Sequence, residues 1–101
     1  MQTELPAQPA TAAGLLLNQL PRQARAVIEH LHMPADVADR GLLLRLIELG
    51  FLPGETVRIV ARAGLGGEPI AVRLGGQSTF ALRAREAALI GVRPLSGAEA
   101  A

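Results

Sequence analysis

One short stretch decides the fold, Leu49-Gly50-Phe51-Leu52-Pro53-Gly54, because a helical pattern ends there and a strand pattern begins. Gly50 stands where a helix ends most readily in a left-handed residue, and Phe51 is placed to contact Leu46 one turn back. Pro53-Gly54 suits the two central positions of a type II turn, since proline fixes φ and glycine accepts a positive φ. These residues predict a helix that enters a strand at a fixed angle.

The helix before this stretch is amphipathic. Its apolar residues share one arc of a helical wheel, and its charged residues share the other. The apolar arc contains Leu42, Leu43, Leu46, Ile47 and Leu49, and the charged arc contains Arg40, Arg45 and Glu48. Asp36, with an acidic residue three positions on at Asp39, is typical of a helix N-cap. The sequence therefore predicts a helix from this cap to Leu49.

Short alternating segments separated by glycine-rich turns predict the strands. The expected strands cover residues 24–31, 55–63, 70–74, 79–83 and 90–93, with one helical turn at 85–88. Short strands at this spacing favour a small closed barrel. The chain is thus expected to be mainly β, a five-stranded barrel with one α-helix between the first and second strands that caps one open end.

At 101 residues the chain is long enough for one domain with a modest core. Residues 1–19, rich in Ala, Gln, Thr and Pro, are expected to form a flexible leader, residues 20–95 the barrel, and residues 96–101 a short tail. The leader contains an apolar patch, Leu15-Leu16-Leu17. This patch either packs on the barrel as a short strand or helical turn, or forms an exposed docking patch.

Composition excludes several classes of protein. The absence of cysteine excludes disulfides and thiolate sites, and the absence of lysine excludes a Walker A lysine. A net charge of +1 without tyrosine or tryptophan argues against nucleic-acid binding by base stacking. The glycines at 64–67 precede a strand instead of a helix, and no serine has a nucleophile-elbow context, so no enzyme is expected. Without a membrane-spanning run or a signal peptide, the protein is expected to be cytoplasmic.

The stretch Leu46–Gly54 closely resembles the helix-to-strand signature of the bacterial ferrous iron transport protein A family. Further matches follow in order at Val57–Val60, Leu65–Ile70 and from Ala81 to Val92. The resemblance implies an SH3-like barrel and a small, non-enzymatic accessory protein of ferrous iron uptake, with no required cofactor. It also implies a partner, the membrane ferrous iron permease that carries a cytosolic G-protein domain.

Arginines recur on the strands at the phase opposite to the apolar residues. The outward phase is expected to hold Arg58, Arg62, Arg73, Arg83 and Arg93. One interpretation is a solvated face of arginine stems. The other is an arginine-lined surface that meets an acidic partner or a phosphate.

His30 and His32 stand two residues apart, so both side chains are expected on one face of the first strand. Two imidazoles on one face can bind a transition metal such as Fe²⁺ or Zn²⁺ weakly if a carboxylate or a second chain completes the shell. Glu29, Asp36 and Asp39 are near in sequence. The alternatives are a metal-responsive homodimerising module and a plain pair of surface histidines.

Leu44 lies inside the charged arc of the helix, between Arg40 and Glu48. It either packs against the leader or the segment near Pro34, or belongs to a partner-docking face formed by Arg40, Leu44, Arg45 and Glu48. A further class of function, a small-barrel RNA-binding protein, predicts a salt-sensitive affinity for RNA.

Overall fold

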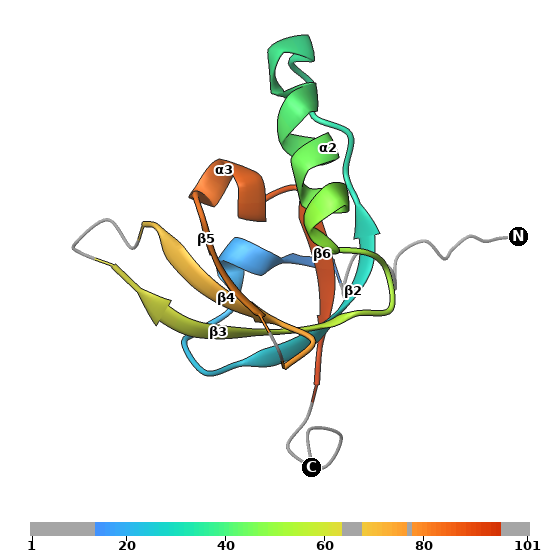
Figure 1. Cartoon of the computed structure of the whole chain (residues 1–101). Coiled ribbons are helices and arrows are strands. Elements are labelled where there is room, and N and C mark those ends of the chain that lie inside the picture. Colours follow the sequence, from blue (N-terminus) through green and yellow to red (C-terminus); the bar gives the residue numbers. More distant parts are fainter. Residues whose placement is uncertain (1–13, 64–67, 77, 96–101) are drawn as a thin grey trace, which may run out of the picture.

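The strands form one antiparallel sheet that coils around the core (Figure 1). The computed structural model describes residues 14–63, 68–76 and 78–95. The sheet order is β1-β6-β2-β3-β4-β5. The strands are β1 (Leu15–Leu16), β2 (Arg25–Leu31), β3 (Thr56–Arg62), β4 (Ile70–Leu74), β5 (Ser78–Leu82) and β6 (Ile90–Pro94). The α-helices are α2 (Arg40–Leu49) and α3 (Ala84–Ala87), and the 3₁₀ helices are η1 (Leu17–Gln19) and η2 (Val37–Asp39).

The described residues contain six strands, so the expectation of five is wrong. The additional strand, β1, pairs Leu15 with Val92 and Leu16 with Gly91. A strand of two residues is too short to show an alternation of polar and apolar positions, but packing of this patch as a short strand or helical turn, the first of the two alternatives above, is confirmed. Leu17 follows in η1 and is fully buried. The end of the expected leader therefore packs on the sheet, whereas the leader before residue 14, the glycines at 64–67 and the tail at 96–101 lie outside the described residues.

One strand arginine is not on the outer phase that alternation predicts. The register of β3 against β4 shifts between Ile59 and Ala61, which places Arg62 directly opposite Ile70. Directly opposite residues share a face of the sheet, and Ile70 is buried. The bulge therefore turns Arg62 to the inner phase, where its guanidinium donates to two carbonyl oxygens of the η1 segment. Arg58, Arg73, Arg83 and Arg93 are exposed.

The core is aliphatic with one aromatic contact at its edge. The ring centroids of Phe51 and Phe80 lie 5.6 Å apart with an interplanar angle of 61°, an edge-to-face arrangement that aromatic pairs favour. The buried apolar residues come from η1, α2, α3, the residues that follow η1 and α2, and every strand except β1. They are Leu17, Leu20, Ala26, Ile28, Leu46, Phe51, Val57, Ile59, Ile70, Val72, Leu82, Ala87, Ile90 and Val92.

The end of α2 has the geometry of a Schellman motif. Gly50 has a φ of 106°. Its N–H donates to the Ile47 carbonyl at 3.0 Å, and the N–H of Phe51 donates to the Leu46 carbonyl at 3.0 Å. These two bonds satisfy carbonyls that the end of a helix leaves without partners.

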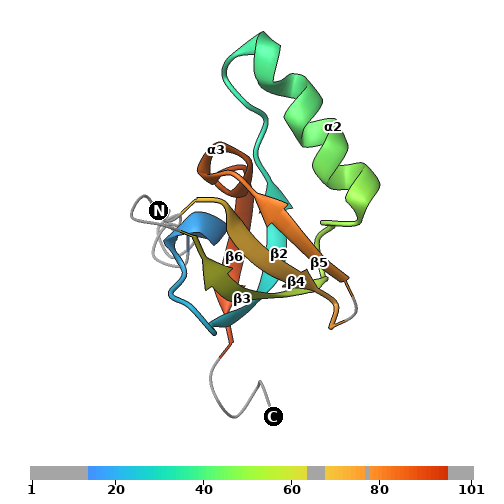
Figure 2. The same ribbon diagram turned by 60° about the vertical axis from the view of Figure 1, so that its left-hand side comes forward.

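A tight turn then leads into β3. Pro53 and Gly54 occupy its centre, Gly54 has a φ of 95°, and the N–H of Glu55 donates to the Leu52 carbonyl at 3.0 Å. This is the type II geometry that needs glycine at the third position. Because the helix stop and the turn are both fixed, α2 leaves the barrel at a set angle and projects from it (Figures 1 and 2).

The end of the barrel is covered differently from the expected arrangement. Leu46 is the one fully buried residue of α2, and this helix rests on α3. The short elements η1 and α3 contact each other and contribute Leu17 and Ala87 to the core. Two single turns therefore cover the barrel end, and α2 is left with much of its surface exposed.

Candidate functional site

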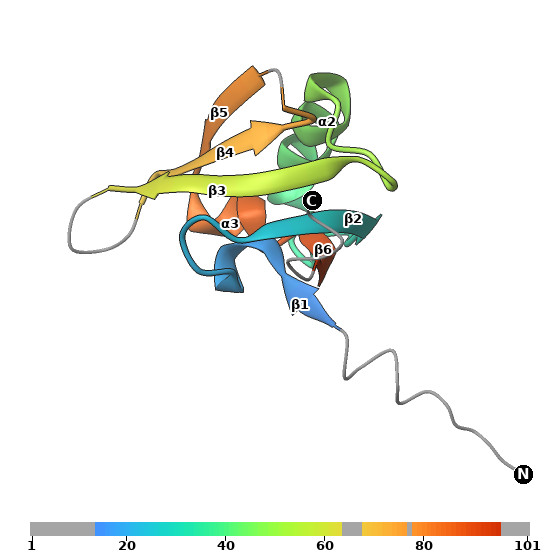
Figure 3. The ribbon, with the colours of Figure 1, turned by 90° about the horizontal axis from the view of Figure 1, so that it is seen from below.

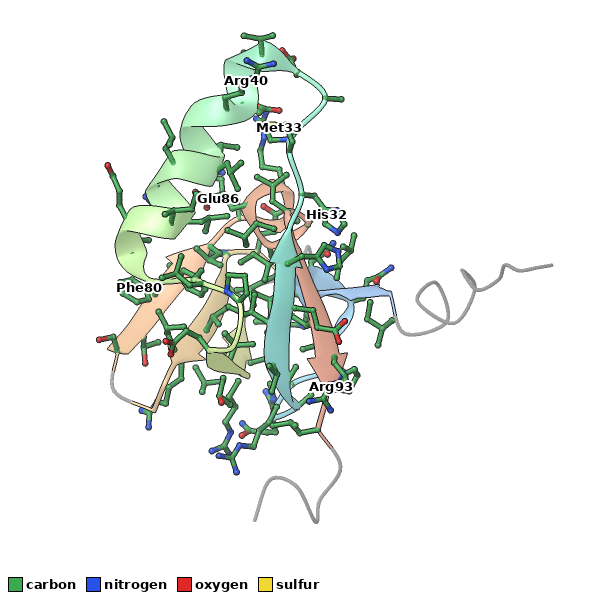
Figure 4. The ribbon with its side chains drawn as sticks, turned by 90° about the vertical axis from the view of Figure 1, so that its right-hand side faces the viewer. His32, Met33, Arg40, Phe80, Glu86 and Arg93 are labelled. Carbon is green, nitrogen blue, oxygen red and sulfur yellow. The ribbon has the colours of Figure 1, made fainter. Side chains whose placement is uncertain are left out.

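Large apolar side chains are exposed on one part of the molecule. Among the described residues, Met33, Val37, Leu44, Ile47 and Leu52 have exposed fractions of 40% to 68%. All five lie in α2 or in the segments that flank it, within residues 33–52, which we name the α2 arm. Figure 4 shows Met33 and Arg40 at the end of this arm that lies farthest from the sheet. The arm is therefore the most apolar accessible surface of the described structure.

The outer side of α2 exposes all four residues of the expected docking face and also Ile47. Leu44 is 61% exposed, and Arg40 and Glu48 are also exposed. Ile47, which was expected in the buried arc, is 40% exposed. Arg45, which was expected in the docking face, forms an ion pair with a carboxylate of α3. The accessible side of α2 consequently presents Arg40, Leu44, Ile47 and Glu48, with Arg45, whose side chain is 49% exposed, at its edge beside α3.

Two ion pairs hold α2 against α3. Glu86 is 6% exposed; its Oε1 accepts the backbone N–H of Arg83 at 2.9 Å, and its Oε2 pairs with Arg45. Both carboxylate oxygens have donors, which is how a nearly buried charge is tolerated. Asp39 pairs with Arg85, and this hydrogen bond and charge raise the pKa of the Arg85 guanidinium, which stays protonated. Figure 4 shows Glu86 between the helix and the barrel.

A groove with a volume of about 480 Å³ adjoins this junction. Its walls come from α2, from the residues around α3 and from the sheet. The lining residues are Arg45, Glu68, Pro69, Ala81, Arg83 and Glu86. Charges of both signs line the groove, so it suits a polar segment of a partner better than an apolar ligand.

The structure brings the two histidine side chains together. His30 Nε2 lies 3.1 Å from His32 Nε2, and the ring centroids are 4.4 Å apart. Two imidazole nitrogens that bind one tetrahedral zinc ion at about 2 Å each lie about 3.3 Å from one another. The ring of His30 lies over Gly91 of β6, where an added Cβ would come within 2.7 Å of Nε2. The two rings are thus within hydrogen-bond distance of one another, a separation that is also close to that of two ligands on one metal ion.

The carboxylates near the histidines in sequence are engaged elsewhere. Glu29 pairs with Arg93 at 3.8 Å, the Asp36 side chain accepts a backbone N–H of η2 at 2.9 Å, and Asp39 belongs to the α2–α3 junction. Within residues 14–63, 68–76 and 78–95, no group of three or more His, Cys, Asp or Glu side chains is placed to hold a metal ion. The histidine pair therefore needs further ligands to complete a shell.

A family model for the FeoA domain matches residues 15–94. The chain belongs to the FeoA family. The match begins with β1 and ends with β6, so it includes all six strands of the described FeoA domain. None of the helices in the described ranges has the length and apolar character of a membrane span.

Solved structures of FeoA proteins share this fold. FeoA of Stenotrophomonas maltophilia, crystallised with zinc, is 40% identical over 84% of this chain and 93% of that chain, with a TM-score of 0.65, and is described as an SH3 domain protein and candidate ferrous iron transport activating factor. FeoA of Chlorobium tepidum is 31% identical over 82% of this chain and 72% of that chain, with a TM-score of 0.66. A manganese-dependent transcriptional repressor, 21% identical, shares the fold over 81% of this chain and 37% of its own length, with a TM-score of 0.67. A search of the curated proteins found no match. The resemblance and the SH3-like fold expected from the sequence are confirmed.

Three residues that the sequence analysis did not select shape the candidate sites of this FeoA domain. Glu86 stands three residues after the N-cap of α3, and a glutamate at that position is a known capping signal. Gly91 interrupts a strand, and such a glycine often marks a close approach of another group. Ile47 carried no signal, because the wheel shows which residues share an arc but not which direction faces the barrel.

Proposed function

We propose that this FeoA domain is a small, non-enzymatic, cytoplasmic accessory of ferrous iron uptake that binds and regulates the membrane ferrous iron permease through its G-protein domain. Membership of the FeoA family and the description of the S. maltophilia relative support the link to ferrous iron transport. The single observation that carries the contact is the α2 arm, which holds all five large exposed apolar side chains of the described residues.

The chemistry of the arm suits a protein partner. Full burial of an exposed leucine or isoleucine stabilises by about 1.5–3 kcal/mol, and Leu44 and Ile47, 61% and 40% exposed, would each contribute part of that as the apolar centre of the arm. Arg40 and Glu48 lie one helical turn to either side of Leu44. Charges at the rim of an apolar centre set the orientation of a partner and the rate of encounter.

Calorimetry with the detergent-solubilised permease, in the presence of GDP and then of a GTP analogue, tests this contact. Leu44→Asp should weaken binding at least about tenfold, because it places a charge at the centre of the apolar face. Ala63→Asp is the matched control, since Ala63 is exposed, lies beyond the end of β3 and gains the same charge. Binding that differs between the nucleotides would support regulation of the G-protein domain. No saturable binding of the wild-type protein in either nucleotide state would refute the proposal.

A second function, metal-responsive dimerisation, is favoured by the 3.1 Å separation of the two histidine nitrogens. Two copies that each present His30 and His32 together supply the four ligands of a tetrahedral Zn²⁺ or Fe²⁺ site. The zinc in the S. maltophilia structure supports a family tendency to bind metal. Sedimentation velocity should show a dimer at micromolar zinc that the double variant His30→Ala/His32→Ala does not form. A zinc-dependent dimer that persists in this variant would refute the assignment.

A further inference from the structure

Three arginines stand in one cross-strand row on the outer face of the sheet. Arg25 on β2 is directly opposite Arg58 on β3, and Arg58 is directly opposite Arg73 on β4. All three are exposed. Figure 3 shows β2, β3 and β4 side by side from this side of the molecule, with α2 behind them. Residues that are directly opposite share a face, so the three guanidinium groups gather on one surface.

The row carries an electrostatic cost that the fold does not require. Like charges directly opposite one another in a sheet destabilise it, and here two such contacts follow in succession. Glu29 pairs with Arg93 on the adjoining strand β6, at one side of the row. Arg58 donates to the Gln23 side chain at 2.6 Å, which is a neutral partner. Among the described residues, no carboxylate forms an ion pair with Arg58 or Arg73.

The row borders a concave site of about 210 Å³. Its lining combines the three guanidinium groups with a hydroxyl and a turn glycine. The lining residues are Arg25, Thr56, Val57, Arg58, Arg73 and Gly76. A guanidinium has five N–H donors and binds phosphate oxygens in pairs. Arg58 uses part of this capacity on Gln23, and Arg25 makes a contact of its own, so the donors for a ligand come first from Arg58 and Arg73.

From this geometry we infer that the outer face of the sheet is an anion site for the phosphate group of a soluble molecule, either inorganic phosphate or a nucleotide. A tetrahedral dianion neutralises the repulsion between Arg58 and Arg73 and accepts from their guanidinium groups together with the Thr56 hydroxyl, with Arg25 beside them. A carboxylate has a single charge and a planar pair of oxygens, so it satisfies a three-arginine site less completely.

The surface argues for a soluble phosphate over a lipid headgroup. The five large exposed apolar side chains are on the α2 arm, and none of them lines this site. Figure 4 shows Arg93, on the strand beside the row, at the end of the molecule opposite Arg40 and Met33. Among residues 14–63, 68–76 and 78–95, the arginine face thus offers no large exposed apolar side chain to insert into a bilayer, and the site is separate from the proposed permease contact.

The test uses the full chain at low ionic strength, with inorganic phosphate and GDP as separate probes in calorimetry and thermal melts. Phosphate should raise the melting temperature more than chloride at equal ionic strength. Arg58→Gln and Arg73→Gln should each weaken phosphate or GDP binding by at least about tenfold. In chloride alone these variants should melt no lower than the wild type, because they remove like-charge contacts. If Arg58 and Arg73 only stabilised the fold, replacing them by glutamine would instead lower the melting temperature in chloride.

Arg22→Gln is the matched control, since Arg22 is exposed, loses the same charge and does not line the site. It should bind both probes as the wild type does. The anion site would be refuted if phosphate and chloride raised the melting temperature equally. It would also be refuted if Arg58→Gln, Arg73→Gln and Arg22→Gln all lost the same affinity for phosphate or GDP. Binding only to phosphatidylglycerol vesicles, to an acidic peptide or to RNA would overturn it as well.

Discussion

Replacing Gly50 by alanine tests the feature on which the architecture depends, the helix stop before β3. Gly50 has a φ of 106°, where an L-residue pays about 1–2 kcal/mol in steric strain. An added Cβ would also lie 3.4 Å from Leu74 Cδ2, which is a tight contact. Alanine also stabilises the folded state by about 0.4–1 kcal/mol relative to glycine, because it lowers the conformational entropy of the unfolded chain. Gly50→Ala should therefore lower the free energy of unfolding by about 1 kcal/mol, and Gly50→Val, with its β-branch, by more.

The same substitution elsewhere in the helix should have the opposite sign. Gly41 lies in the first turn of α2, and an added Cβ there would meet nothing within 4 Å. Gly41→Ala should stabilise the protein by about 0.5–1 kcal/mol, because glycine is a poor helix former. For a domain of this size, 1 kcal/mol corresponds to a shift of about 4–8 °C in melting temperature. Urea and thermal unfolding should resolve the two variants to either side of the wild type.

The reasoning fails if Gly50→Ala melts at or above the wild-type temperature. It also fails if the melting temperatures of Gly50→Ala and Gly41→Ala change by similar amounts in the same direction. The difference between the two variants measures the cost of the left-handed backbone at position 50. In either case Gly50 would not fix the angle at which α2 leaves the barrel.

Three further substitutions probe contacts that the structure assigns. Leu17→Ala should lower the free energy of unfolding by about 2–4 kcal/mol, since Leu17 is fully buried; an unchanged urea midpoint would contradict the docking of η1. Arg45→Met should cost about 1–3 kcal/mol and speed hydrogen exchange in α2, because the nearly buried Glu86 loses its cation. Exchange at the wild-type rate would show that the ion pair does not hold the helix. Gly91→Ala should weaken zinc binding measured by calorimetry, since the new Cβ would displace the His30 ring; wild-type affinity would argue against a metal site at the histidine pair.

The sequence predicted the elements whose signals are local. The end of α2 and the turn after it are written in consecutive residues from Gly50 to Gly54, and the structure has a left-handed Gly50 and Gly54 there. For Leu15-Leu16-Leu17 the sequence offered packing on the barrel as a short strand or helical turn as one of two alternatives, and the structure confirms it, but two residues show no period and their pairing partners lie in β6, far along the chain. The direction of Arg62 was missed, since one bulge after Ile59 inverts the phase of the residues at the end of β3.

The sequence could predict that α2 has an exposed apolar residue, but not which other side chains lie beside it. The wheel placed Leu44 on a polar arc, and the structure exposes it. The wheel could not show that Arg45 turns toward Glu86, because that contact spans 41 residues of sequence. In the structure Arg45 pairs with Glu86, Leu46 is buried in the core, and Ile47 is 40% exposed. Which apolar residues of α2 are accessible to a partner therefore depends on contacts with α3 and the core that lie far along the chain.

The separation of the apolar arm from the arginine row makes the two proposals independent of one another. In Figure 1, α2 projects from the barrel on the side away from β3, the strand that carries Arg58. Leu44→Asp should therefore leave phosphate binding unchanged, and Arg58→Gln should leave binding to the permease unchanged, when each variant is titrated with both ligands. If Arg58→Gln also weakens binding to the permease while Arg22→Gln does not, the arginine row is part of the protein contact. The anion it meets would then be an acidic surface of the partner and not a soluble phosphate.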